Sequence, residues 1–186
     1  MTDNLSIRAA GPADLDAAAA LTAAYPYKRL QQRLQGMDRT RLQEFFREGL
    51  RRGLESGRPH WLALEGERPA ALAGLAEATW HSGIYGMTMM RVEPWLNVER
   101  PEAGARLLDE VEAAAWARGA EHLSLRIDGA DFANLHLLEG RGWRTVDVSL
   151  KFSRPMEVPF VVEVRPELVL GLATPDDAEW IRRIGS

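Results

Sequence analysis

Four side chains that can accept or release a proton lie in the sequence around one short apolar run, residues 87–92. Glu77 and Glu93 carry carboxylates, His81 carries an imidazole, and Tyr85 carries a phenol. Such groups act as general bases or acids when their pKa lies near the working pH and the proton is within hydrogen-bond reach. These four are the candidate catalytic residues, although a solvent-facing charge is the commoner role for such a carboxylate.

Other reaction chemistry has little support in the sequence. The chain has no cysteine, which excludes disulfides, thiolate zinc sites and a cysteine nucleophile. The histidines are dispersed without the His-x-x-x-His spacing of a metal site, and no Ser-His-Asp signature is present. They are His60, His81, His122 and His136. The sequence therefore predicts no metal site.

Three strands and two helices are expected to position the candidates. Residues 87–92 predict a buried strand, ended by Glu93-Pro94 because proline cannot donate a ladder hydrogen bond. Residues 101–118 predict a helix, with Pro101 in its first turn and Gly119 as its cap. Three further elements follow in the order strand, helix, strand: residues 122–128, 131–141 and 144–152.

The N-terminal part predicts more elements of the same kind. A strand, a turn and an apolar-faced helix precede a second helix and a β-hairpin. In chain order these are residues 5–8, 11–14, 15–21 and 40–53, with hairpin strands 60–65 and 71–80 around the turn 66–69. Between the two helices, residues 25–37 include four aromatic or basic side chains: Tyr25, Tyr27, Lys28 and Arg29.

In this order the elements resemble the core of the Gcn5-related N-acetyltransferase (GNAT) superfamily. The motifs that carry the resemblance, over residues 5–155, are Val92-Glu93-Pro94, Leu107-Leu108 and Gly142-Trp143. The resemblance implies an α/β fold, with a GNAT-like mixed central β-sheet flanked by helices on both faces. It also implies acetyl transfer from acetyl-CoA to an amine, with residues 25–37 as an acceptor-binding lid. The alternative for that segment is a surface loop.

The resemblance further implies which residues bind the substrates. The backbone of residues 91–93 would hold the thioester, and the loop before the next helix would hold the CoA pyrophosphate. The implied residues are Arg91, Val92, Glu93, Arg100, Gly104, Ala105, Asp131 and Asn134. His81 and Tyr85 would face the acceptor amine, and Glu77 or Glu93 would deprotonate it.

The loop itself departs from the family pattern. Glu102 stands where the first glycine is expected, and Glu99 where a glutamine or arginine is expected. Both carboxylates would repel a pyrophosphate. Gly104 keeps the third small position, and Arg100 is the best available cation. The alternative is a helix start rich in capping residues, in which Glu102 interacts favourably with the helix dipole.

Two later polar positions are also replaced. Asp131 aligns with the asparagine of the family, and Leu138 aligns with its tyrosine, often the general acid. Leucine cannot donate a proton. Asn134 lies nearby but three residues late. For Asp131 the alternative is an ordinary helix N-cap.

The opening of the chain is repeated near its other end, because LSIRAAGPAD at residues 5–14 matches LVLGLATPDD at 168–177. Helical residues follow in both, and repeats of whole domains leave this kind of trace. The prediction is a GNAT-like domain at 1–155, a linker at 156–167 and the start of a second GNAT-like repeat at 168–186, in a tandem protein that continues further. The alternative is a set of extra terminal strands and a helix of one domain.

Composition narrows the partners. The net charge of −4 gives no general nucleic-acid footprint. No run of about 20 apolar residues predicts a membrane span, and the first residues lack a signal peptide, so a cytoplasmic location is expected. Arginine is common and lysine rare beside abundant alanine, leucine and glycine, which suggests a GC-rich bacterial genome.

Two classes of function follow. The first is an acetyl-CoA-dependent N-acetyltransferase of the GNAT type that acts on an unknown primary amine. The second is a non-catalytic GNAT-like module that packs against a second, catalytic GNAT domain, regulates it, or forms a homodimer. The loop carboxylates, Asp131 and Leu138 favour the second class for this half, whereas the family resemblance favours the first for a full protein.

Overall fold

The computed structural model describes residues 4–25, 39–98, 100–148 and 171–184. The chain divides into two compact units, Met1–Thr145 and Val146–Ser186, and each is treated by itself.

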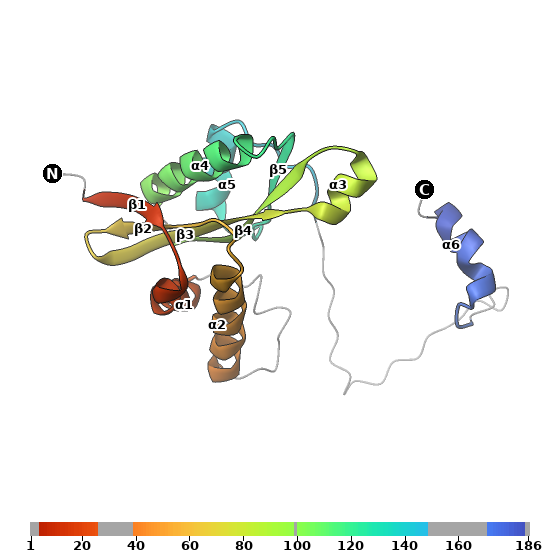
Figure 1. The fold of residues 1–186 in the computed structure, drawn as a ribbon, viewed down its shortest axis with the longest axis horizontal. Coiled ribbons are helices and arrows are strands. Elements are labelled where there is room, and N and C mark those ends of the chain that lie inside the picture. Colours follow the sequence, from red (N-terminus) through yellow and green to blue (C-terminus); the bar gives the residue numbers. More distant parts are fainter. Residues whose placement is uncertain (1–3, 26–38, 99, 149–170, 185–186) are drawn as a thin grey trace. The chain divides into compact units, whose positions relative to one another are not determined.

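A five-stranded sheet forms the centre of the first unit (Figure 1). Its strands follow one another in chain order: β1 (Leu5–Ala9), β2 (His60–Glu65), β3 (Arg68–Glu77), β4 (Met89–Asn97) and β5 (His122–Leu125). β1 to β4 pair antiparallel, whereas β4 and β5 are parallel. A parallel pair needs a crossover connection, which the helix α4 (Pro101–Trp116) supplies.

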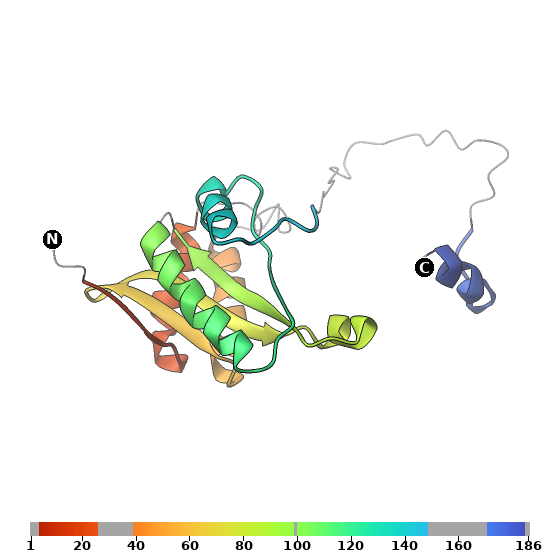
Figure 2. The same ribbon diagram turned by 90° about the horizontal axis from the view of Figure 1, so that it is seen from above.

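Helices cover both faces of this sheet (Figures 1 and 2). α4 and α5 (Phe132–Gly140) lie on one face, and α1 (Leu15–Ala24) lies on the other, where α2 (Arg39–Glu55) packs against α1. The core under α4 includes Leu107, Leu108 and Val111, and the core under α1 includes Leu62 and Leu72. The mixed sheet with helices on both faces confirms the predicted fold class.

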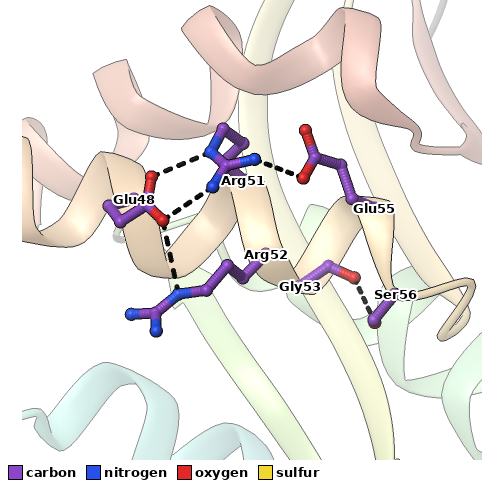
Figure 3. A network of polar contacts seen from close by, with 6 residues as sticks. All are labelled: Glu48, Arg51, Arg52, Gly53, Glu55 and Ser56. Carbon is purple, nitrogen blue, oxygen red and sulfur yellow. Dashed lines mark hydrogen bonds and ion pairs between the residues drawn. The ribbon is translucent and has the colours of Figure 1, made fainter.

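α2 confirms the helix predicted over residues 40–53, and its exposed side carries a network of ion pairs (Figure 3). Arg51 lies 2.7 Å from Glu48 and 2.5 Å from Glu55, and Arg52 lies 3.6 Å from Glu48. Spacings of three and four residues place these groups on one helix face, where each pair adds roughly 0.2–0.5 kcal/mol. Beyond the network, the Ser56 hydroxyl donates to the Gly53 carbonyl at 2.6 Å.

The central strand does not end at Glu93-Pro94, so that prediction was wrong. β4 passes through this cis peptide bond and continues to Asn97. Glu93 and Pro94 together stand opposite the single residue Gly74 of β3, which makes a β-bulge. Because a bulge leaves a residue unpaired, the missing N–H of proline interrupts no ladder hydrogen bond there.

The second hairpin strand lies three residues earlier than predicted, at Arg68–Glu77 instead of residues 71–80. It ends at Glu77, and Trp80 lies in a short helix, α3 (Thr79–Tyr85), instead of a strand. The Ser82 hydroxyl donates to the Ala78 carbonyl at 3.2 Å, which supports the helical turn. Gly86, with φ of +65°, ends α3, because glycine adopts this left-handed conformation readily.

Two other strand predictions also differ from the structure. β5 ends at Leu125 instead of residue 128, since its pairing with β4 stops at that residue. Residues 144–148, the described part of the strand predicted over 144–152, are not in a strand. Val146 and Val148 are exposed there, so their alternating pattern meets no sheet within the described part of the chain.

The second unit contains η3 (Pro175–Asp177) and α6 (Ala178–Ile184). The Thr174 backbone N–H and hydroxyl donate to Asp177 Oδ2 at 2.7 and 2.9 Å. In the first unit, the Gly11 N–H donates to Asp14 Oδ2 at 3.0 Å beside η1 (Pro12–Asp14). The two copies of the sequence repeat, at residues 11–14 and 174–177, therefore share a local capping pattern. The predicted linker, residues 156–167, lies outside the described ranges. None of the described helices is long and apolar enough to cross a membrane.

Candidate functional site

β4 and β5 separate halfway along β4. Their pairing runs from Met89 opposite His122 to Val92 opposite Leu125, and β4 then continues to Asn97. Among the described residues, no strand pairs with this side of β4 beyond Val92. Backbone polar groups there need side chains, water or a ligand as partners. We call this region the β4–β5 gap, and it is the candidate functional site.

The bulge in β4 stands at the start of the β4–β5 gap, and Gly74 makes room for it. A Cβ atom at residue 74 would lie 2.6 Å from the Glu93 carbonyl oxygen and 2.6 Å from His60 Cδ2. No side chain fits at that distance. Glycine is therefore needed so that β3 can approach Glu93 and His60 closely, and not because of an unusual backbone angle. Gly74 and the His60 ring therefore fix the path of the backbone at Glu93.

A buried polar cluster connects α5 to β4 in the gap. Asn134 Oδ1 accepts from Trp95 Nε1 at 3.1 Å and from Asn97 Nδ2 at 2.8 Å. Asn134 Nδ2 donates to the Asn97 carbonyl at 3.0 Å and to Asp131 Oδ2 at 2.7 Å. Asn134 and Asp131 are fully buried. The Asn134 amide thus uses its full capacity of two donated and two accepted hydrogen bonds.

These contacts fix the orientation of both amides. Trp95 Nε1 can only donate, so the Asn134 atom that it meets is the oxygen. Asn97 must then present its Nδ2 to the same oxygen, which leaves Asn97 Oδ1 buried without a hydrogen-bond partner. Leaving a buried acceptor unpaired costs roughly 1–3 kcal/mol. Asn97 Oδ1 is therefore the acceptor of this cluster that the described residues leave unpaired.

The first turn of α4 packs directly over Asn97. A Cβ atom at residue 104 would lie 2.4 Å from Asn97 Nδ2 and 2.7 Å from Leu137 Cδ2, so Gly104 permits this approach. Gly104 is itself buried. Its visible role is the close packing of α4, which brings the unpaired N–H groups of the helix start near the gap.

Tyr25 ties the end of α1 to the same cluster. Its hydroxyl donates to Asp131 Oδ2 at 2.5 Å. Asp131 Oδ1 accepts from the Asn134 backbone N–H at 3.2 Å, so Asp131 is also the N-cap of α5. Tyr25 is half-buried. The other residues of the predicted lid, Tyr27, Lys28 and Arg29, lie outside the described residues.

The sequence matches no protein-family model and no curated protein, whereas solved structures match its fold. A GCN5-related N-acetyltransferase from Ralstonia eutropha JMP134 is 21% identical with a TM-score of 0.56, over 83% of this chain and 99% of that chain. The chain has the GNAT fold. AAC(6')-Iy, solved with the bisubstrate analog CoA-S-monomethyl-acetylneamine, is 13% identical with a TM-score of 0.54, over 81% and 98% of the chains. A ribosomal-protein-alanine N-acetyltransferase from Brucella melitensis biovar Abortus 2308 is 15% identical with a TM-score of 0.55, over 81% and 98%.

Within this GNAT fold, the implied cofactor-binding residues occupy three places. Arg91, Val92 and Glu93 lie on β4, where Arg91 and Glu93 form an ion pair at 2.6 Å and Val92 is buried in the core. Arg100 precedes α4, with its Nε 3.5 Å from Glu65 Oε1. Gly104 and Ala105 lie in the first turns of α4, and Asp131 and Asn134 lie at the start of α5. Glu99 lies outside the described residues.

The four candidate acid–base residues do not come together in the GNAT fold. Glu93 lies at the bulge, beside the β4–β5 gap. Glu77 ends β3, while His81 and Tyr85 lie on α3 before β4 begins. The His81 ring packs edge-on against Trp80 at 4.8 Å, and Tyr85 is exposed. Leu138, predicted to align with the family tyrosine, is buried in the core.

The sequence analysis did not identify Asn97 and His60 as residues that shape the candidate site. Asn97 could be found only after Pro94 is placed inside the strand, because Trp95 and Asn97 then alternate onto the α4 face. His60 lies between α2 and β3, next to Gly53 and Gly74, and no sequence pattern marks that position. Its Nδ1 donates to the Arg58 carbonyl at 2.8 Å, and burial lowers the pKa of His60. No group in the described part of the chain gathers three side chains that could hold a metal ion.

Proposed function

We propose that this protein transfers an acetyl group from acetyl-CoA to a primary amine. The observation that carries the proposal is the β4–β5 gap, which opens at the Glu93 bulge of a GNAT fold. Two structures of the same fold support it. One holds a bisubstrate analog that joins CoA to an acetylneamine, and the other is an N-acetyltransferase for ribosomal-protein alanine.

The residues around the gap fit acetyl-CoA. The pantetheine arm of CoA carries amide groups, and its pyrophosphate is anionic. The backbone of β4 beyond Val92, which no described strand pairs on this side, suits these amide groups. Arg100 and the first-turn N–H groups of α4 would hold the pyrophosphate. Glu102 opposes this attraction, so Arg100 supplies the main favourable charge.

The transfer makes one bond and breaks one. The amine nitrogen attacks the thioester carbonyl carbon, the C–N bond forms, and the C–S bond breaks with its electron pair moving to sulfur. The amine passes its surplus proton to a base. Glu93 is the candidate for this base, because its carboxylate lies beside the gap. Leu138 has no proton to give, so the departing thiolate takes one from water. The protein contributes mainly by holding the two reactants in contact.

The lack of cysteine in the chain gives a clean assay for this activity. Any thiol that a disulfide reagent detects must be CoA released from acetyl-CoA. We expect release above the uncatalysed rate when the protein is mixed with acetyl-CoA and a panel of primary amines. The corresponding alcohols should leave CoA release at the uncatalysed rate. A panel of amines that all stay at the uncatalysed rate would contradict the proposed transfer.

A second candidate function is a non-catalytic GNAT-like module that packs against or regulates a catalytic GNAT domain. The replacement of the family tyrosine by the buried Leu138 favours it. The capping pattern at residues 174–177 also favours it, because the pattern repeats that at residues 11–14. The helix that follows, α6, has an exposed Trp180. These features support a second GNAT-like repeat over residues 168–186, after a linker at 156–167. Acetyl-CoA binding without thiol release for any amine would favour this candidate.

A further inference from the structure

A surface of large apolar side chains lies on the short helix α3, away from the β4–β5 gap. In both views α3 stands beyond the end of the sheet (Figures 1 and 2). Four side chains of this helix and the turn after it are 39–70% exposed and belong to neither hydrophobic core: Trp80, Ile84, Tyr85 and Met87. We call these four residues the α3 patch.

The hydrogen bonds of α3 keep this patch on its outer side. Ser82 faces the sheet, because its hydroxyl oxygen accepts from the Met89 backbone N–H of β4 at 3.0 Å. Trp80 and Ile84 stand two residues before and after Ser82, so helix geometry turns both of them away from β4. Their exposed fractions, 70% and 56%, agree with this placement. The Trp80 ring meets the His81 ring of the same helix edge-on at 4.8 Å.

The segment that carries the α3 patch has no acidic residue, lysine or arginine. This holds for residues 78–90, which Glu77 precedes and Arg91 follows. An apolar centre without charges, inside a polar rim, is the usual anatomy of a protein interface. In a two-fold interface each surface meets its own copy, so a segment without charges also avoids like-charge repulsion.

A lipid surface fits the same patch less well. Helices that lie on membranes usually carry lysine or arginine beside their apolar face, which attracts them to anionic lipids. Residues 78–90 have neither, and the chain has a net charge of −4. A second copy of the chain is therefore the better partner for this surface.

The area of the α3 patch matches the smallest specific interfaces. Its side chains present roughly 500 Å² per copy, since a large aromatic side chain has roughly 150–250 Å² of surface and Trp80 and Tyr85 are 70% and 63% exposed. Exposed apolar patches of this size are often functional. Two copies would bury roughly 1,000 Å², the lower limit for a specific interface, which corresponds to a weak dimer.

We propose that the α3 patch is a self-association surface, through which two copies of this protein form a weak two-fold dimer. Trp80 and Ile84 of each copy pack against the same patch of the other copy. The dimer does not rest on the proposed acetyl transfer, because α3 lies outside the β4–β5 gap.

Sedimentation equilibrium of the whole chain tests this surface. The average mass should rise from that of a monomer towards that of a dimer between about 1 µM and about 1 mM protein, with a Kd on the order of 100 µM. Trp80→Ala should weaken the dimer by at least about thirty-fold, because a buried tryptophan anchors an interface and the change acts in both copies. Ile84→Glu should leave only monomer, because it brings two like charges into the apolar interface.

Phe45→Ala is the matched control, since Phe45 is a comparably exposed aromatic residue on α2. It should change the Kd by less than about two-fold, the behaviour of a residue outside the interface. All three variants should unfold at the denaturant concentration of the wild type. The proposal is overturned if the wild type stays monomeric at every concentration, or if neither α3 variant weakens the dimer. Monomeric wild type that sediments with phospholipid vesicles would also overturn it, and would assign the patch to a lipid surface.

Discussion

Asn134→Ala should lower the free energy of unfolding by roughly 3–5 kcal/mol, measured by chemical denaturation. The Asn134 side chain makes four hydrogen bonds of 2.7–3.1 Å with Trp95, Asn97 and Asp131. Alanine removes all four and leaves buried groups of Trp95 and Asn97 without partners. Each such orphaned group costs about 1–3 kcal/mol, which is more than the net value of the bond itself.

The control for this variant is His136→Ala, on the exposed side of the same helix, α5. It should change the unfolding free energy by no more than about 0.5 kcal/mol. A double-mutant cycle of Asn134→Ala with Trp95→Phe should give a coupling energy of roughly 0.5–3 kcal/mol. A cost for Asn134→Ala equal to that of the control would show that the cluster does not hold α5 to β4.

Gly74→Ala should destabilise the protein by about 2–3 kcal/mol and also weaken acetyl-CoA binding. The new Cβ atom would lie 2.6 Å from the Glu93 carbonyl oxygen, and 2.6 and 2.8 Å from two atoms of the His60 ring. The carbonyl belongs to the backbone, so the bulge itself must move. Denaturation and calorimetry on the same variant would measure both effects.

Gly49→Ala is the matched control for this substitution. Gly49 lies within α2, where a Cβ atom would meet nothing within 4 Å. Alanine there should stabilise the protein by up to about 1 kcal/mol, because glycine is a poor helix residue. A Gly74→Ala variant as stable as the wild type would mean that the bulge does not approach β3 as closely as described.

The sequence was enough to predict the layers of the fold and the order of β1 to β5 with α1, α2, α4 and α5, but not α3. Helical spacing around Leu107-Leu108 placed α4 correctly, although it ends at Trp116 instead of residue 118. Gly119 adopts a φ of +71° just beyond α4, as its capping role requires. Such local signals depend on neighbouring residues alone, which explains their success.

The predictions that failed depend on contacts between distant residues. Pro94 reads locally as the end of a strand, and only the pairing of β4 with Gly74 shows that it lies inside a bulge. The alternation of residues 71–80 does not reveal that the strand gives way to α3 after Glu77. The partners of Asn134 come from β4, 37 to 39 residues away, so sequence spacing could not find them.

The most direct test of the proposed function is a calorimetric titration of acetyl-CoA into this protein. We expect saturable binding at one site. Arg100→Ala should weaken it by about 1–3 kcal/mol, the cost of losing a charged hydrogen-bond partner. Arg47→Ala, on α2 and away from the face that carries α4, should leave the affinity unchanged. Absence of binding heat at millimolar acetyl-CoA would contradict the proposed acetyl transfer.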